Sequence, residues 1–249
     1  MSGHSKWATI KRKKGALDAA RGRMFTRLIR EITIAARQGG GDPAGNPRLR
    51  TAVSTAKAAN MPKDNIDRAI KKGTGELEGA SYEEVTYEGY GAGGAAILVN
   101  ALTDNRNRTV SEVRRLFEKC GGSMGTAGCV AWMFKKRGVI LVEAGQTDED
   151  RLMEVALEAG ADDVGAAGDG FEVVTSPEAF EAVRAAITGA RIAVASAEVA
   201  LVPESTVSLR GREAEQTVRL LQELDDHDDV QTVASNADFL QEDIDRLSA

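Results

Sequence analysis

The stretch that decides the fold is residues 138–202, which read GVILVEAGQTDEDRLMEVALEAGADDVGAAGDGFEVVTSPEAFEAVRAAITGARIAVASAEVALV. The apolar runs VILVEA and IAVASAEVALV at its two ends are typical of strands, whereas DEDRLMEVALEAG and PEAFEAVRAAI have the periodicity of helices. Two short strands are expected around Gly168-Asp169-Gly170. The resulting order predicts a ferredoxin-like βαββαβ unit.

The residues on either side contain the elements of a second, interrupted unit. Residues 203–249 supply a strand, a helix and a strand (TVSL, AEQTVRLLQELDD and VQTVAS), which alone would bury too little apolar surface to fold. The elements that complete the set lie upstream: a strand over 95–103, a helix over 108–120 and a strand over 129–134, followed by a turn at Lys135–Gly138. We therefore predict that one ferredoxin-like unit is inserted in another.

From Asp18 to Gly73 the sequence has the period of helices, whereas Ser2–Gly15 has too few apolar residues to build a core and is expected to be flexible until an anion orders it. The first helix is expected to run from an N-cap at Asp18 to the glycines that begin at Gly39. Two shorter helices follow, one after Asn46-Pro47 and one between Pro62 and Gly73. The chain is therefore expected to be an α+β protein, an N-terminal helical bundle followed by the two ferredoxin-like units. The predicted domains are 1–75, 76–137 plus 203–249, and the inserted 138–202.

The net charge of −6 hides a strong asymmetry along the 249 residues. Residues 1–75 contain 17 Lys and Arg against 5 Asp and Glu, a net of +12, and residues 76–140 contain 8 of each. Residues 141–249 contain 7 Lys and Arg against 25 Asp and Glu, a net of −18. We expect the basic end to meet nucleic acid and the acidic end to be repelled by it or to bind a protein partner. The alternative is that the basic end docks on the acidic part of the same chain or of a neighbour.

Two groups of basic residues are candidate phosphate contacts at the basic end. The first is an N-terminal arm without acidic residues, and its members are Lys6, Lys11, Arg12, Lys13 and Lys14. The second is a face of the first helix, where Arg23, Arg27 and Arg30 recur at spacings of four and three. Like charges at such spacings repel each other within a helix, so an external polyanion would stabilise this face.

Arg106 and Arg108 form a third candidate site, between a strand and a helix. Thr109 and Glu112 have the spacing of a capping box, which places both arginines at the positive end of the helix dipole. Backbone N–H groups and two guanidinium groups at one helix end suit a phosphate. Pairing with Asp104, or with an acid on another module, is an equal alternative.

No catalytic or metal-binding constellation is recognisable in the sequence. Cys120 and Cys129 are too few for a zinc site and are expected to be reduced thiols. His4 and His227 have no ligand spacing with either cysteine, and no Ser-His-Asp or Cys-His arrangement is evident. We therefore expect no enzyme, no metal and no cofactor.

Three other classes of protein are disfavoured. The glycines Gly89, Gly91 and Gly94 have the spacing of a dinucleotide motif, but a strand follows them where a helix is required, so a hairpin turn is expected. Aromatic residues make up 4%, and no aromatic pair suited to stacking single-stranded RNA is found. No run approaches the roughly 20 apolar residues of a membrane helix, and the N-terminus lacks the apolar core of a secretory signal. A cytoplasmic protein without membrane contact is expected.

Four longer motifs carry a resemblance to a known family. They are GHSKWATIK at residues 3–11, NMPK at 60–63, YEGYG at 87–91 and LTDNRNRT at 102–109. Together they resemble the YebC/PmpR family over the whole length of the chain, although Ala92 stands where the family usually has proline. The resemblance implies a cytoplasmic protein with a helical N-terminal domain and two α/β domains, and it implies nucleic-acid contact for the basic arm. Members are classed as probable DNA-binding transcriptional regulators, whereas others, such as the mitochondrial translational activator of cytochrome c oxidase, are translation factors.

We therefore expect a non-enzymatic nucleic-acid-binding regulator of gene expression, and specifically a DNA-binding transcriptional regulator. Two alternatives stay open. The chain could bind ribosomal RNA at the ribosome as a translation factor, or its ferredoxin-like units could sense a small metabolite. No set of base-reading residues is found, so binding is expected to rest on phosphate contacts and to weaken steeply with salt.

Overall fold

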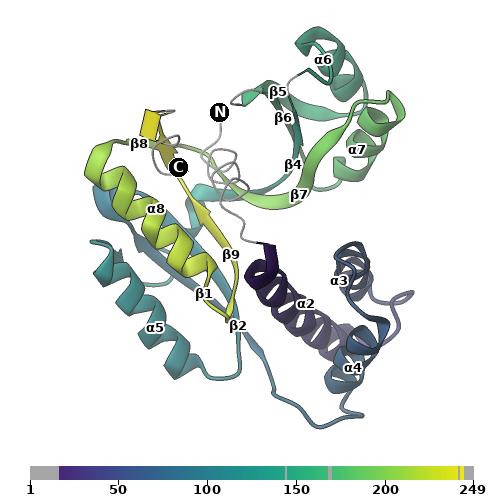
Figure 1. Cartoon of the computed structure of the whole chain (residues 1–249), viewed down its shortest axis with the longest axis vertical. Helices are drawn as coiled ribbons and strands as arrows, with labels where there is room; N and C mark the ends of the chain where they lie inside the picture. Colours follow the sequence, from purple (N-terminus) through teal and green to yellow (C-terminus); the bar gives the residue numbers. More distant parts are fainter. Residues whose placement is uncertain (1–16, 144, 168–169, 241, 244–249) are drawn as a thin grey trace.

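The computed structural model of the chain describes residues 17–143, 145–167, 170–240 and 242–243 (Figure 1). It shows three helices followed by two four-stranded antiparallel sheets, each with two helices on one face. We call the three helices the head, the first sheet with its helices the body, and the second sheet with its helices the insert. The predicted α+β fold is confirmed.

The head consists of α2 (Leu17–Gly39), α3 (Pro47–Ala58) and α4 (Lys63–Thr74). Its core is formed by the apolar stripes of the three helices, which include Ile32, Leu49 and Ile66. Asn46 caps α3 by accepting a hydrogen bond from Leu49 N at 3.1 Å, and its Nδ2 donates to Ala35 O at 2.7 Å. The same side chain therefore begins α3 and ties it to α2.

The body is a sheet of four strands in the order β3-β1-β2-β9. The strands are β1 (Glu83–Tyr90), β2 (Ala96–Thr103), β3 (Ser123–Met124) and β9 (Val230–Ser235). Helices α5 (Arg106–Lys119) and α8 (Gly211–Asp225) cover one face of this sheet, with Phe117 and Leu221 buried beneath them. The glycine-rich link between β1 and β2 is the expected hairpin turn, a short 3-10 helix η1 (Ala92–Gly94).

The insert has the strand order β5-β6-β4-β7. Its elements are β4 (Phe134–Val142), α6 (Glu149–Glu158), β5 (Ala161–Ala167), β6 (Gly170–Thr175), α7 (Phe180–Gly189) and β7 (Val194–Pro203). All neighbouring strands are antiparallel, and the first strand of the unit lies between the third and the fourth. This is the arrangement of a ferredoxin-like unit, so the topology predicted for residues 138–202 is confirmed.

The body departs from the predicted second βαββαβ unit at its third strand. The predicted strand TVSL is β8 (Val207–Leu209), but it pairs in parallel with β10 (Ala237–Phe239) in a separate two-stranded sheet. The inner position that it would have taken belongs to β1, which pairs with both β2 and β3. β1 can take this position because it forms a hairpin with β2 through the short η1 turn.

Two neighbouring predictions around residue 130 are wrong. Residues 129–133 do not form a strand, because the short 3-10 helix η2 (Ala131–Met133) lies there, and Phe134 already begins β4. The cause is the buried carboxylate of Glu88, which accepts hydrogen bonds from Gly128, Val130 and Ala131 N at 2.6–2.7 Å and withdraws these groups from any ladder. Lys135–Gly138 is not a turn but part of β4, because each of these residues pairs with β7.

The three parts are joined in different ways. Body and insert share an apolar cluster that includes Leu98 of β2, Phe134 of β4 and Leu201 of β7, and β4 runs across the boundary expected between 137 and 138. Among the described residues, the apolar cluster of the head has no member in common with the clusters of body or insert. The domain boundaries remain predictions, but the head is attached mainly by polar contacts.

Candidate nucleic-acid interface

The predicted contact residues fall into two groups in the structure. Lys6, Lys11, Arg12, Lys13 and Lys14 of the arm lie outside the described residues. Arg23, Arg27 and Arg30 lie together on α2, on the side that faces the C-terminal end of α8. We call these three the arginine row, and we call residues 225–229, which they contact, the acidic turn.

Each member of the arginine row contacts a different aspartate of the acidic turn. Arg23 Nη2 lies 3.0 Å from Asp226 Oδ1, and Arg27 Nη1 lies 3.3 Å from Asp225 Oδ1. Arg27 also donates to the backbone carbonyl of Asp225. The basic face of the first helix therefore has the intramolecular partner that its sequence left as an alternative.

Arg30 makes the most buried of these contacts. Its Nη1 lies 2.6 Å from Asp229 Oδ1, and the two side chains are 13% and 2% exposed. The same atom donates to the carbonyl oxygens of Asp228 and Leu102, at 2.6 and 3.2 Å. The guanidinium also lies over the ring of Tyr82, 5.4 Å from its centroid. Arg30 thus joins α2 to the end of α8, to β2 and to the segment that precedes β1.

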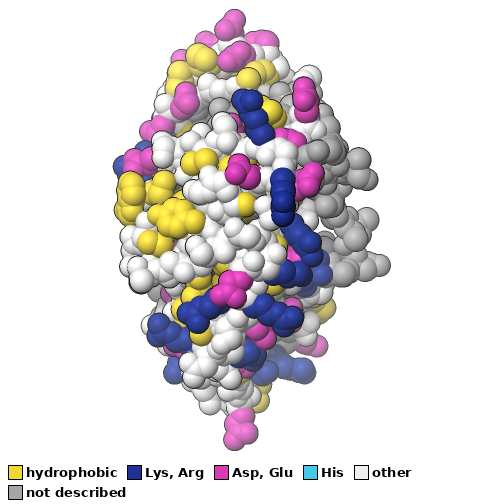
Figure 2. Space-filling model, turned by 90° about the vertical axis from the view of Figure 1, so that its left-hand side faces the viewer, with side chains coloured by type: hydrophobic (Ala, Val, Ile, Leu, Met, Phe, Trp, Pro, Cys, Tyr) yellow, Lys and Arg dark blue, Asp and Glu magenta, His cyan; other side chains and the backbone are white. Residues whose placement is uncertain are grey.

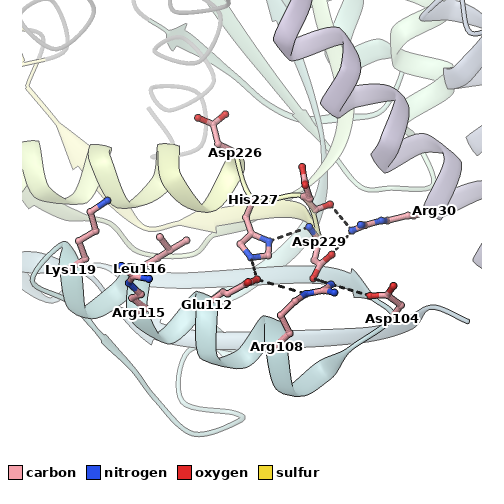
Figure 3. A pocket seen from close by; sticks show the side chains of 11 residues that line it. Arg30, Asp104, Arg108, Glu112, Arg115, Leu116, Lys119, Asp226, His227 and Asp229 are labelled. Carbon is pink, nitrogen blue, oxygen red and sulfur yellow. Dashed lines mark hydrogen bonds and ion pairs between the residues drawn. The ribbon is translucent and has the colours of Figure 1, made fainter. Parts of the chain in front are cut away.

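Asp229 is the central group of this network (Figure 3). Its Oδ2 accepts hydrogen bonds from Thr109 Oγ1 at 2.6 Å, from Arg108 Nη2 at 2.7 Å and from Thr103 Oγ1 at 3.2 Å. Burial alone would raise the pKa of this carboxyl, but the hydrogen bonds from Thr109, Arg108 and Arg30 outweigh burial and lower the pKa to about 2. Asp229 is therefore an ionised, fully engaged carboxylate.

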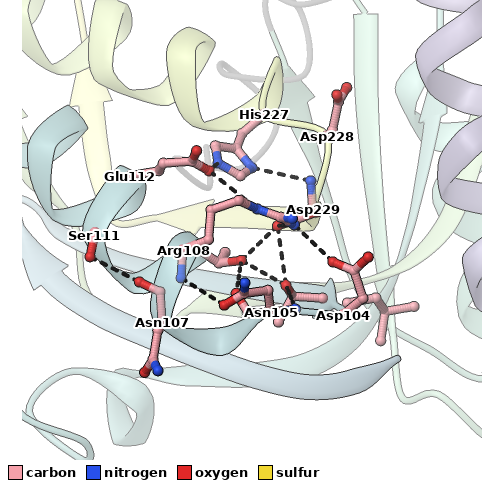
Figure 4. Close-up of polar contacts among 12 residues, drawn as sticks. Asp104, Asn105, Asn107, Arg108, Ser111, Glu112, His227, Asp228 and Asp229 are labelled. Carbon is pink, nitrogen blue, oxygen red and sulfur yellow. Dashed lines mark hydrogen bonds and ion pairs between the residues drawn. The ribbon is translucent and has the colours of Figure 1, made fainter. Parts of the chain in front are cut away.

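Arg108 lies in the first turn of α5, but not as the sequence predicted (Figure 4). The helix begins at Arg106, and its N-cap is Asn105, which accepts from Arg108 N at 3.1 Å. The capping box of Thr109 and Glu112 is wrong, because Thr109 is buried inside the helix and bonded to Asp229.

The guanidinium of Arg108 pairs with two carboxylates. It lies 3.0 Å from Asp104 Oδ1 and 2.7 Å from Asp229 Oδ2. The pairing with Asp104 that the sequence raised as an alternative is therefore observed, whereas the second acid belongs to the same body as Arg108 and not to another module. The side chain of Arg106, by contrast, is exposed and forms no hydrogen bond or ion pair within the described part of the chain.

A pocket of about 600 Å³ lies beside Arg108, between α5 and the acidic turn. His227 accepts from Asp229 N through Nδ1 at 3.1 Å, and its Nε2 lies 2.9 Å from Glu112 Oε2. Ligand atoms of Glu112, His227 and Asp229 lie within 4.8 Å of one another, which is close enough for a metal ion. A cation does not suit this place, because Arg30 and Arg108 already hold the two oxygens of Asp229 with positive charge.

The cations of the body are interspersed with acids. Figure 2 shows the face of the molecule that carries α5 and α8, where Lys and Arg side chains gather in a band over its lower half with Asp and Glu among them. Lys119 and Arg219 both pair with Glu223 there, at 2.8 and 3.0 Å. This face therefore offers less net positive charge than its number of cations indicates.

The head carries a second set of cations that the sequence did not single out. Within the described chain their side chains are exposed and form no hydrogen bond or ion pair, and they are Lys57, Lys63, Arg68, Lys71 and Lys72. The first two flank the turn between α3 and α4, and the last three share a face of α4. Their spacing of i, i+3 and i+4 is visible in the sequence, whereas their lack of carboxylate partners in the described chain is visible only in the structure.

Comparison with known proteins covers nearly the whole chain. The family model of the TACO1/YebC protein N-terminal domain matches residues 5–76, and that of the TACO1/YebC second and third domain matches residues 82–237. A probable transcriptional regulatory protein of Desulfatibacillum aliphaticivorans is 64% identical over 239 residues, 96% of this chain and 97% of the relative. One of Geobacter sulfurreducens is 58% identical over 247 residues, 99% of this chain and 100% of the relative.

A solved structure shares the fold as well. The crystal structure of a conserved hypothetical protein from Aquifex aeolicus has 47% sequence identity and a TM-score of 0.78, and the match covers 90% of this chain and 93% of that chain. Among the described residues, no helix combines the length and the apolar character needed to cross a membrane.

Proposed function

Because the chain belongs to the TACO1/YebC family, we propose that it is a DNA-binding transcriptional regulator that works in the cytoplasm and contacts DNA through its basic head and arm. Relatives with 55–64% identity carry the name probable transcriptional regulatory protein. The resemblance first noted in four motifs thus extends to full-length relatives, and their names support a role in regulation.

The observation that carries the proposal is the set of exposed cations on α3 and α4. Their ammonium and guanidinium groups have no carboxylate partner within the described residues, so they remain available to phosphates. Cations that are already paired would have to give up a carboxylate first. The net charge of +12 over residues 1–75 adds long-range attraction for a polyanion.

The arm and Arg106 extend this surface in the proposal. Lys6, Lys11, Arg12, Lys13 and Lys14 follow one another closely without an acid between them, a pattern suited to phosphate contact. Arg106 is exposed at the N-terminal end of α5, where backbone N–H groups add to its positive charge. The acidic insert is repelled by DNA, which orients the molecule with its head toward the duplex.

The test is the binding of a short mixed-sequence DNA duplex, followed by fluorescence anisotropy at several salt concentrations. The double variant Arg68→Ala/Lys72→Ala should weaken binding several-fold and reduce the slope of log K against log salt by about 0.9 for each phosphate that is no longer neutralised. The matched control is Arg184→Ala/Arg219→Ala, which removes the same charge from exposed arginines of α7 and α8.

Equal affinities and slopes for the two double variants would contradict the proposal. Co-sedimentation with ribosomes at the same salt concentrations distinguishes the other role raised by the resemblance. Firm association with ribosomes, together with no binding to duplex DNA, would replace the transcriptional role with one in translation.

A further inference from the structure

We propose that the arginine row of α2 is itself a phosphate-binding surface, that the acidic turn covers it in the present structure, and that duplex DNA displaces the acidic turn. The inference rests on the proposed function, but it concerns a different surface from the exposed cations of α3 and α4. It assigns to Arg23, Arg27 and Arg30 a partner that they do not contact here.

The acidic turn, which covers the arginine row, offers the three arginines the same kind of ligand as phosphate does. Three guanidinium groups along one helix face meet three carboxylates of one short turn, at 2.6–3.3 Å. Guanidinium groups bind carboxylate and phosphate oxygens with the same geometry, so either anion satisfies the same donors. The acidic turn therefore occupies the row in the way that a nucleic-acid backbone would.

The contact between head and body is one that can open. Among the described residues no apolar cluster spans the two parts, and burial of apolar surface is the main force that holds domains rigidly together. The connection along the chain is the exposed segment of residues 75–81, which contains no helix or strand. Among the described residues, the contacts that hold the head against the body are thus ion pairs and hydrogen bonds.

The closed contact also leaves two donors unsatisfied. The Nε atoms of Arg27 and Arg30 are buried and have no hydrogen-bond partner in the described structure. A buried N–H group without a partner is unfavourable, and hydration or a phosphate oxygen would relieve it. The cost of these two unsatisfied N–H groups offsets part of the stabilisation that the three ion pairs contribute.

The body keeps its own network when the head departs. Asp229 Oδ1 accepts from Arg30, whereas Oδ2 is held by Thr109, Arg108 and Thr103 of the body itself. Loss of Arg30 therefore does not strand a bare buried charge, the situation that makes most buried ion pairs costly to break. Asp226 is 62% exposed already and would simply become hydrated.

Duplex DNA offers more negative charge than the acidic turn. From Arg23 to Arg30 the helix rises about 10 Å, at about 1.5 Å for each residue. Over that length a DNA duplex presents about six charges, at about one for every 1.7 Å of its axis, against the four carboxylates of the turn, three of which the row contacts. The exchange of carboxylate for phosphate is thus favourable once the exposed cations of the head have brought the duplex near.

The first experiment compares DNA affinity between two charge-matched variants of the full chain. Asp225→Asn/Asp226→Asn removes two carboxylates of the cover, and Glu149→Gln/Asp150→Asn removes two exposed carboxylates of α6. Relative to the second variant, the first should bind the duplex at least about five-fold more tightly, which corresponds to about 1 kcal/mol. Its salt dependence should also be steeper, because its arginines no longer exchange one anion for another.

The second experiment links the acidic turn covalently to α2, so that it cannot leave the arginine row. In the variant Arg23→Cys/Asp226→Cys, with Cys129→Ser to remove the partly exposed native thiol, a short bis-maleimide joins head to acidic turn. The cross-linked protein should bind DNA more weakly than the same variant without the linker. An RNA duplex of the same sequence, measured in parallel, should bind more weakly, and tighter binding of RNA would overturn duplex DNA as the ligand that displaces the acidic turn.

The outcomes separate the two proposals. If the wild type binds DNA but the two charge variants bind alike and the cross-link has no effect, the covered surface is wrong and the proposed function stands. If neither wild type nor variants bind DNA, the proposed function is wrong and the inference falls with it.

Discussion

Asp229 joins three parts of the chain that are distant in sequence. Its partners Arg30 and Arg108 lie 199 and 121 residues away, and each arrives from a separate helix. The sequence shows the acidic run DDHDD around it but nothing that distinguishes the fifth residue from the other acids. The fold makes the distinction, because Asp229 alone of the run's acids is buried.

Replacing this residue should destabilise the protein strongly. Asp229→Asn removes the charge that Arg30 and Arg108 face in a buried site, so the free energy of unfolding should fall by about 3 kcal/mol. Urea unfolding followed by circular dichroism measures the change. The neighbouring exposed Asp226→Asn should change it by less than about 1 kcal/mol, and similar effects of both variants would show that Asp229 is not the central group.

The same carboxylate predicts a pH dependence. The pKa of Asp229 is about 2 in the folded protein, below the value near 3.9 of an unfolded chain. Its stabilisation is therefore fully present above about pH 5 and is lost as the pH falls through the window between the two pKa values. The difference in stability between wild type and Asp229→Asn should be constant above that window and shrink within it. A difference that grows on acidification would contradict this.

Glu88 is the second buried carboxylate with a structural role. Burial opposes its ionisation, but three backbone N–H groups lower its pKa below the usual value. Glu88→Gln should therefore reduce stability by about 2 kcal/mol and loosen the loop that holds Trp132. In a Trp7→Phe background, the fluorescence of Trp132, which is 71% exposed, reports the change. The exposed Glu83→Gln is the control and should leave both stability and emission unchanged.

At the scale of elements, the sequence predicts most helices and strands to within a few residues. Periodicity and caps decide these, and they are local properties. The predicted strand at 129–134 and the predicted position of β8 in the sheet are wrong for a common reason. Their conformation depends on Glu88 and on the β1–β2 hairpin, which reach them from other parts of the chain. The spacing of the α4 cations is visible in the sequence. The contact between the arginine row and the acidic turn, by contrast, is visible only in the tertiary structure.

Two glycines in helices of the head test how closely α2 and α4 pack. A Cβ at Gly73 would lie 2.7 Å from Ala36 Cβ and overlap the carbonyl oxygen of Thr33, whereas one at Gly22 meets nothing within 4 Å. Gly73→Ala should therefore destabilise the head by about 1–3 kcal/mol. Gly22→Ala should stabilise it by about 0.5–1 kcal/mol, because alanine favours helix. Thermal unfolding of both variants checks the opposite signs, and a stabilising Gly73→Ala would show that the helices can separate freely.

At the scale of the whole molecule, salt should act on the attachment of the head and not on the insert. At 1 M salt the screening length falls to about 3 Å, which weakens the exposed Arg23–Asp226 pair between α2 and the acidic turn and, to a smaller extent, the two more buried pairs. Hydrogen exchange in α2 and in residues 75–82 should therefore quicken between 0.1 M and 1 M salt, whereas β4 and β7 serve as the internal control. Uniform quickening across the molecule would show that salt acts on global stability instead.

The joint between body and insert differs from that of the head in a mechanical sense. β4 and β7 are paired from Phe134 with Pro203 at the body to Val142 with Val194 at the far end, with one register shift between Leu141 and Val142. Two hydrogen-bonded strands together resist both bending and twisting. The single segment of residues 75–81 that leads to the head contains no helix or strand, so it transmits a pull but no rotation. A rotation imposed on α6 and α7 would therefore turn the body with them, whereas the head would follow only as long as its ion pairs with the acidic turn stay closed.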